Sequence, residues 1–277
     1  MNVHLSNTLI EQIERLLVPP GQLALWALGQ AGFVVKGGAT IAYIDPYLSD
    51  AIAEGGGPAR RFPVPLDPAG VTHARVVFAT HEHADHVDPA TLVPLMAASP
   101  QARLVTSTQG RDLAVDAGIA AERLHTPRLG ERVELAGLAY IPIPAAHYEY
   151  EVDAEGHSRW MGFLIECNGV NLYHAGDTIV IPELIEALRD TRIDVALLPT
   201  NGRDFFREQQ QLIGNLWPRE SVQLATQLGA GVLIPMHNDL FEENRLNPAL
   251  FFDALERHAP WQRCHLLQPG ELYLYAG

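Results

Sequence analysis

The stretch THEHADHVDP at residues 80–89 concentrates side chains that can bind metal ions. His81 and His83 are separated by one residue, so in an extended chain their side chains leave the same face. Asp85 and His86 follow them directly. Imidazole and carboxylate groups together suit zinc, manganese or iron. The spacing H-x-H-x-D-H therefore predicts a metal site.

The motif and three further metal-competent residues each follow a hydrophobic run. ARVVFAT precedes the motif and is typical of a strand buried on both faces. His147 ends IPIPAAH, Asp177 ends LYHAGD and His237 lies in IPMHND. Ligands of α/β sheets bind at the carboxyl ends of strands, so we expect these residues to meet at one centre. We expect His174, three residues before Asp177, to support or pack against that centre without binding the metal.

Strand and helix patterns alternate along the chain and supply the frame for these residues. Strand patterns lie at 22–28, 32–37, 40–50, 74–80, 103–108, 133–147, 160–177, 194–200, 231–239 and 264–276. Helix patterns lie at 1–18, 88–99, 109–118, 181–190, 218–230 and 247–260. The long stretch 51–70 is rich in Gly, Pro and Ala and is expected to be a loop.

This order of elements predicts an α/β protein with four layers, an αββα sandwich. In each half strands come first and strand–helix units follow, which favours two mixed sheets packed face to face with helices outside. No linker composition interrupts the chain. We therefore expect one domain over 1–277, with two pseudo-symmetric halves at about 1–145 and 146–277. Asp88 and Pro89 predict the start of a helix, as N-cap and first helical residue.

The charge and the cysteine content narrow the function classes. The net charge is 19 − 33 = −14, which disfavours nucleic acid as a partner. The two cysteines, Cys167 and Cys264, form no CxxC pattern. No apolar run reaches 18 residues, and the first 18 residues favour an amphipathic helix over a signal peptide. A cytoplasmic protein that acts on a small molecule, without a membrane span, is expected; homo-oligomers stay open.

The motifs together resemble the metallo-β-lactamase superfamily. The matching segments are IDP with Asp45, THEHADHVDP, AAH with His147, HAGDT with Asp177, and PMHND with His237. The resemblance implies the sandwich fold and one or two divalent metal ions. It implies one metal site of His81, His83 and His147, a second of Asp85, His86 and His237, and Asp177 as a bridge. Asp45 matches a position that supports the site without binding metal.

Some segments are similar to one branch of that superfamily, the L-ascorbate-6-phosphate lactonases. They are PPGQLALWALGQAGFVVK, LYHAGDT, IDVALLPTNGRD and IPMHNDLF. The resemblance implies a cytoplasmic, metal-dependent enzyme that opens a sugar-acid lactone. Those lactonases are longer, and a carboxylate is expected at the place of His147. This difference predicts another metal preference or another substrate.

We therefore predict a metal-dependent hydrolase of a small, anionic lactone or ester, with a phosphorylated sugar acid as the model substrate. Zinc or manganese, with iron as a further option, would lower the pKa of a bound water from about 15.7 to near 7 and so supply hydroxide. Asp85 is expected to orient this nucleophile and to accept its proton. Two alternatives stay open: a phosphodiesterase or nuclease, which the net charge disfavours, and a non-catalytic metal-binding protein, which the complete ligand set disfavours.

The substrate contacts are expected in the polar segment 200–220, which follows a predicted strand. Arg203 and Arg207 could clamp a phosphate or carboxylate through planar guanidinium donors. Asn201 or Asn238 could donate to a developing oxyanion. Tyr148 and Arg159 are candidates for a lid over the site.

Overall fold

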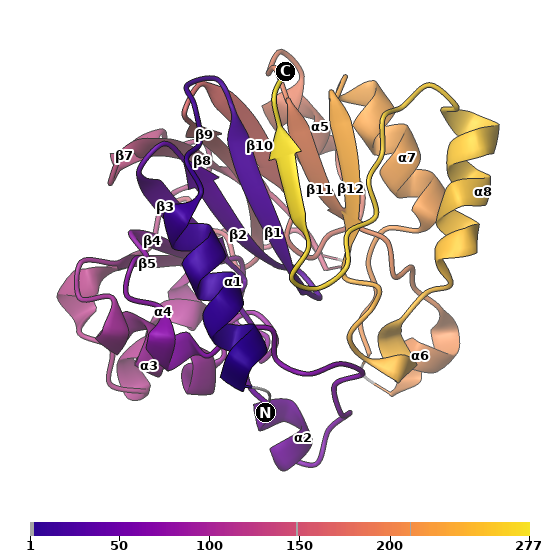
Figure 1. The fold of residues 1–277 in the computed structure, drawn as a ribbon. Helices are drawn as coiled ribbons and strands as arrows, with labels where there is room; N and C mark the ends of the chain where they lie inside the picture. Colours follow the sequence, from indigo (N-terminus) through magenta and orange to yellow (C-terminus); the bar gives the residue numbers. More distant parts are fainter. Residues whose placement is uncertain (1–2, 148, 211) are drawn as a thin grey trace.

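The computed structural model describes residues 3–147, 149–210 and 212–277, and it contains two mixed β-sheets (Figure 1). The first sheet has the order β13-β1-β2-β3-β4-β5-β6 and the second the order β12-β11-β10-β9-β8-β7. The first comprises β1 (Leu23–Gly29), β2 (Gly32–Gly37), β3 (Thr40–Ile44), β4 (Val76–Ala79), β5 (Arg103–Thr106), β6 (Leu124–His125) and β13 (Leu272–Tyr275). The second comprises β7 (Val133–Leu135), β8 (Leu138–Pro144), β9 (Met161–Cys167), β10 (Val170–His174), β11 (Val195–Pro199) and β12 (Val232–Met236).

Helices cover the outer face of each sheet, which confirms the predicted four-layer sandwich. The first sheet packs against α1 (Val3–Arg15), α3 (Pro89–Ala98) and α4 (Thr108–Asp116). The second packs against α5 (Pro182–Leu188), α7 (Pro218–Gln227) and α8 (Pro248–His258). None of the helices within the described ranges is long and apolar enough to cross a bilayer.

The alternation along β1 shows how one strand serves two cores. Leu23 and Leu25 belong to the core that contains the facing sides of both sheets, whereas Trp26 belongs to the core under the outer helices. Successive side chains of a strand point to opposite faces, and both faces of β1 are buried. Between the sheets, Phe78 of β4 contacts Phe163 of β9 with ring centroids 4.8 Å apart. The sheets are thus fixed face to face next to the strand ends that carry the site.

The predicted frame holds at the start of α3 and differs chiefly in short elements. Asp88 caps α3 as expected, because its side chain accepts a hydrogen bond from the backbone N–H of Ala90. The predicted loop 51–70 contains α2 (Ala51–Glu54) and a 3₁₀ turn, Pro68–Gly70. The polar segment after β11 contains α6 (Phe205–Gln209). Two more 3₁₀ turns lie at Ala121–Arg123 and Glu242–Asn244.

Candidate metal centre

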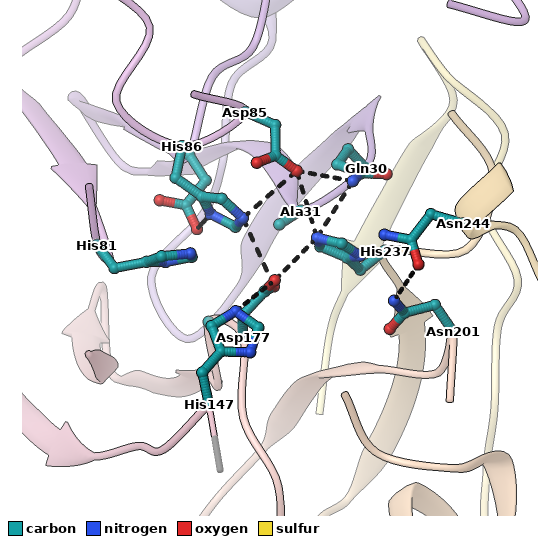
Figure 2. Close-up of polar contacts among 12 residues, drawn as sticks. Gln30, Ala31, His81, Asp85, His86, His147, Asp177, Asn201, His237 and Asn244 are labelled. Atoms are coloured by element: carbon teal, nitrogen blue, oxygen red, sulfur yellow. Dashed lines mark hydrogen bonds and ion pairs between the residues drawn. The ribbon is translucent and has the colours of Figure 1, made fainter. Parts of the chain in front are cut away.

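The metal-competent residues of the sequence meet where strands of both sheets end. The motif 80–86 follows β4, His147 follows β8, Asp177 follows β10 and His237 follows β12. The side chains of all these strand ends converge in Figure 2. The predicted meeting at one centre is therefore what the fold produces, and each sheet supplies part of it.

Among the described residues, three groups of ligand atoms lie close enough to hold an ion. They are His81, His83 and His147; His81, His86 and Asp177; and Asp85, His86 and His237, with the atoms of each group within 4.8 Å of one another. The first and third groups are the two sets that the family resemblance implies. The second group joins them through Asp177.

The distances within the cluster fit atoms that share a cation. Nε2 of His237 lies 3.0 Å from Asp177 Oδ2 and 3.4 Å from Asp85 Oδ2. Nε2 of His147 lies 3.2 Å from Asp177 Oδ2, and Nε2 of His86 lies 3.5 Å from Asp177 Oδ1. Ligands about 2.1 Å from a tetrahedral metal ion are separated by about 3.4 Å. The side chains are thus spaced for divalent cations without rearrangement of the strand ends.

Several polar atoms of the cluster are buried and lack a hydrogen-bond partner. Among the described residues these atoms include His81 Nε2, His86 Nε2, both ring nitrogens of His147, and Asp177 Oδ1. An unsatisfied buried polar atom costs about 1–3 kcal/mol, so a group of them at one point needs a compensating ligand. Metal ions would satisfy them, and the donor set therefore fits divalent cations.

Asp45 orients two of the histidines from behind. It follows β3, and its carboxylate accepts hydrogen bonds at 2.8 Å from Nδ1 of His86 and from Oγ1 of Thr80. Oγ1 of Thr80 lies 3.0 Å from Nδ1 of His81. Because both Nδ1 atoms are engaged on this side, both Nε2 atoms face the centre. Contacts of this kind orient the ring of a metal-binding histidine, and the supporting role expected of Asp45 stays a prediction.

Backbone strain accumulates at the same place. Five described residues other than glycine have positive φ, and three of them, Gln30 (55°), Asp45 (43°) and His237 (59°), contact the centre. Such conformations cost of order 1–3 kcal/mol and persist where the surrounding structure enforces them. The strain indicates that the surrounding fold holds these three residues in place against their own backbone preference.

Attraction between the charged groups of the cluster outweighs the effect of burial on their pKa values. Burial disfavours the charged form of His237, but the carboxylates of Asp177 and Asp85 outweigh it and raise the pKa of its imidazole to about 10. For His86, burial is likewise outweighed, chiefly by Asp45, and its pKa lies well above the ordinary value. Burial would raise the pKa of Asp85 and Asp177, yet the neighbouring histidines lower it. Both carboxyl groups are therefore ionised at neutral pH and available to a cation.

Gln30, in the turn between β1 and β2, is a site residue that sequence reasoning missed. Its Nε2 donates to Asp85 Oδ2 at 2.8 Å and lies 3.1 Å from His237 Nε2. Its backbone oxygen accepts from the N–H of His237 at 2.7 Å. A lone glutamine in a turn carries no metal or catalytic signal, so only the fold shows that it fixes Asp85.

His174 is buried next to the centre with both ring nitrogens engaged. Nε2 lies 2.8 Å from the backbone oxygen of Ala31, and Nδ1 accepts from the N–H of Gly176 at 3.1 Å. The histidine therefore braces the turn that carries Asp177.

The four expected substrate contacts have partners within the protein. Arg203 donates to both carboxylate oxygens of Glu220 at 2.7 Å. Arg207 donates to Asp204 Oδ2 at 2.6 Å and to the backbone oxygen of Asn201. The side chain of Asn201 donates to Asn244 Oδ1, and that of Asn238 donates to Thr200 Oγ1.

Of the two residues expected to form a lid, Arg159 contacts the motif at residues 80–86. Tyr148 falls outside the described residues. Nε of Arg159 donates to Glu82 Oε1 at 2.6 Å, and its guanidinium carbon lies 4.6 Å from the ring centroid of Trp160. Trp160 in turn contacts His147 edge to face. Arg159 thus connects the motif 80–86 to the segment that carries His147.

The centre opens into a small pocket of about 230 Å³. His83, Asp85, Asp177 and His237 form its floor. A larger hollow of about 630 Å³ lies between α7 and α8, but its described lining includes none of the residues of the three ligand groups. The pocket at the centre therefore gives a small molecule access to the candidate metal ligands.

A model of the family described as Beta-lactamase superfamily domain matches residues 40–238. The chain belongs to the metallo-β-lactamase superfamily. The match includes every residue of the three ligand groups as well as Asp45. The resemblance predicted from the strand-end motifs is thereby confirmed.

Similar proteins include metal-dependent hydrolases. The chain is 32% identical over 249 residues to a protein of Methanoculleus marisnigri named "UPF0173 metal-dependent hydrolase", with 88% of this chain and 93% of that protein covered. It is 25% identical over 272 residues to a "Probable L-ascorbate-6-phosphate lactonase UlaG" of Salmonella choleraesuis, with 86% and 75% covered. The chain thus groups with metal-dependent hydrolases of the superfamily.

A solved structure agrees with the fold. Igni18, a metallo hydrolase from the archaeon Ignicoccus hospitalis, superposes with a TM-score of 0.69 over 92% of this chain and 98% of its own, at 21% identity. This likeness supports the two-sheet architecture.

Proposed function

We propose that the protein hydrolyses a small carboxylic ester or lactone with the help of one or two divalent cations, zinc, manganese or iron. The cations would be held by His81, His83, Asp85, His86, His147, Asp177 and His237. One observation carries the proposal: the cluster with its unsatisfied buried nitrogen and oxygen atoms forms the floor of a pocket. A purely structural metal site would be closed to solvent, whereas a catalytic one keeps access for a substrate.

The cations would supply Lewis acidity, which lowers the pKa of water from about 15.7 to near 7 and polarises the oxygen of the substrate. Asp85 is the carboxylate that would accept the proton of the attacking water. Its side chain lines the pocket, is ionised at neutral pH and is held by Gln30. A water oxygen adds to the acyl carbon while Asp85 accepts the water proton. The acyl C–O bond then breaks, and the proton passes to the departing alkoxide oxygen, which gives an acid and an alcohol, or one hydroxy acid from a lactone.

A phosphorylated sugar-acid lactone is the finer form of this proposal, based on similarity to the lactonase branch. It needs cationic groups for the phosphate. Arg203 and Arg207 would have to exchange their carboxylate partners, Glu220 and Asp204, to serve as such a clamp. The proposed reaction is therefore hydrolysis of an ester or lactone bond and does not require a phosphate on the substrate.

The test is hydrolysis by purified protein loaded separately with Zn²⁺ and Mn²⁺, followed by acid release. The substrates are simple esters, uncharged lactones, L-ascorbate 6-phosphate and a phosphodiester. We expect turnover of an ester or lactone that falls about 10²–10⁴-fold in Asp85→Asn, the range of a lost general base. Asp190→Asn, an exposed carboxylate after α5, is the matched control and should keep full activity. Metal-loaded protein that cleaves only the phosphodiester would refute the proposal.

A further inference from the structure

The wall of the pocket above the metal centre is mainly apolar. Ile52 and Pro58 come from the segment after β3, Leu212 and Ile213 from the segment after α6, and Phe241 from the segment after β12. Drug-sized ligands occupy pockets of roughly 300–1,000 Å³, so a space of about 230 Å³ fits a smaller molecule. Polar groups that enter such a wall lose their hydration without replacement, whereas apolar groups gain.

The lining carries no lysine or arginine among the described residues. Its one charged group apart from the floor is Glu243, an exposed residue with no ion-pair partner in the described part of the chain. Three arginines near the lining in sequence are held in ion pairs: Arg61 and Arg245 pair with Glu242, and Arg207 pairs with Asp204. Arg60 donates to the backbone oxygens of Tyr47 and Ser49 and is not among the described residues that line the pocket. An anionic group on the part of the substrate that contacts the pocket wall would meet the carboxylate of Glu243 and no lysine or arginine of the lining.

Asn244 offers the pocket a hydrogen-bond donor of fixed orientation. Its Oδ1 accepts from Asn201 Nδ2 at 2.8 Å and from Arg207 Nη1 at 3.1 Å. Because a guanidinium can only donate, the atom of Asn244 that faces Arg207 must be the oxygen. The amide nitrogen therefore points the other way, toward the side of His237 in Figure 2, and has no acceptor among the described residues.

We infer that this pocket selects a substrate that is uncharged and apolar away from its scissile bond, and that Asn244 donates a hydrogen bond to a substrate oxygen. The inference rests on the proposed hydrolysis and names the class of its substrate: small esters or lactones with an alkyl substituent. Arg207 and Asn201 act as positioning residues, since they hold the amide of Asn244 and do not reach the substrate. Asn201 and Arg207, which the sequence suggested as substrate contacts, thus act on the substrate through Asn244.

The experiment compares two lactones of matched size on metal-loaded protein: γ-butyrolactone with a propyl group and the same ring with a carboxyethyl group. We expect kcat/KM to be at least about tenfold higher for the propyl compound. Glu243→Lys should shift this ratio toward the carboxyethyl compound by about tenfold. Asn244→Leu should lower kcat/KM for the propyl compound about 10²-fold, the loss typical of one donor to a developing oxyanion. Asn171→Ala, on β10 at the opposite end from the site, should change neither value.

A binding measurement makes the inference independent of turnover. Calorimetric titration of metal-loaded Asp85→Asn with both lactones should show tighter binding of the propyl compound. Equal or better turnover of the carboxyethyl lactone would overturn the inference and leave the hydrolase standing. If no ester or lactone is cleaved, the proposed hydrolysis fails, and the titration alone decides: equal or tighter binding of the carboxyethyl lactone overturns the inference. Asn244→Ser, with a circular dichroism spectrum as a folding check, covers the case in which Asn244→Leu does not fold.

Discussion

Asp45 shows how a residue that contacts no ion can decide whether ions bind. Its carboxylate accepts from His86 Nδ1 and from Thr80, and so leaves Nε2 of His86 directed at the centre. In Asp45→Asn the amide NH₂ can face Nδ1, which shifts the ring proton to Nε2. Loss of such a supporting contact reduces metal affinity about 10–100-fold. We expect this reduction in a competition titration against a metal-binding dye.

The matched control for Asp45→Asn is another buried carboxylate. Asp194 lies at the amino end of β11, where it accepts hydrogen bonds from Asn171, Arg192 and Tyr275. Asp194→Asn should lower stability but leave metal affinity unchanged. If both variants lose affinity equally, the effect of Asp45 is a general loss of folding and the orienting role is wrong.

The protonation of His86 and His237 predicts that metal uptake releases protons. Both pKa values are raised by carboxylates, to about 10 for His237, so both rings carry an additional proton in metal-free protein at neutral pH. A cation at Nε2 must displace it, so apparent metal affinity should rise with pH until about 10. In metal-free protein the sign is the opposite: the stabilisation is complete below about pH 6.5 and is lost as pH rises through about 10.

The measurement is calorimetric titration with Zn²⁺ near neutral pH in buffers that differ in ionisation enthalpy. We expect about two protons to be released for each chain that fills the site containing His86 and His237. A binding enthalpy that does not depend on the buffer would contradict this protonation state.

At the scale of elements, local signals predicted more than long-range ones. The helix after Asp88 could be predicted because its cap is a contact between residues two positions apart. Strand ends with a histidine or aspartate could be predicted because position relative to a strand is visible in sequence. α2 and α6 have only four and five residues, too few for a hydrophobic pattern of helical period to repeat, and were not predicted.

The contacts of single polar residues with the site could not be predicted because they depend on the packing of distant segments. Gln30 and Asp85 are 55 positions apart, and Asn201 and Asn244 are 43 apart. The pairing of Arg203 with Glu220 likewise depends on how the segment after β11 folds back on α7. The residue type made Arg203 a candidate for the clamp, but it could not show that Glu220 of the same chain accepts from both of its Nη atoms.

The ion pair of Glu82 with Arg159 connects two elements that carry ligands. Oε2 of Glu82 is buried without a partner, so the carboxylate depends on Arg159. Arg159 is 37% exposed, and its pairing contributes on the order of 1 kcal/mol. Arg159→Met should lower the free energy of unfolding by more than this, about 1–3 kcal/mol, because it leaves the mostly buried carboxylate of Glu82 unpaired. Urea unfolding of Arg159→Met, Glu82→Gln and the double variant measures the coupling; strictly additive losses would show that the pair does not connect the segments.

At the scale of the molecule, the centre links the two sheets. His81, His83, Asp85 and His86 extend from the end of β4 in the first sheet, whereas His147, Asp177 and His237 extend from strands of the second. The protein also carries a net charge of −14, to which the buried carboxylates contribute. Divalent cations would join loops of both sheets and reduce that charge at its most buried point. Metal binding and global stability should therefore be coupled.

Metal removal tests this coupling. A ligand that binds only the folded state at 100 times its Kd stabilises it by about 2.7 kcal/mol. For a chain of this size the gain corresponds to a rise in Tm of about 5–10 °C. We expect this rise when Zn²⁺ is added to protein treated with EDTA, and a return to the lower Tm when EDTA is added again. Asp177→Asn should lose most of the rise, because Asp177 contacts histidines from both sheets. An unchanged Tm in protein shown to carry metal would mean that the two sheets hold together without the centre, and that the cations serve the chemistry alone.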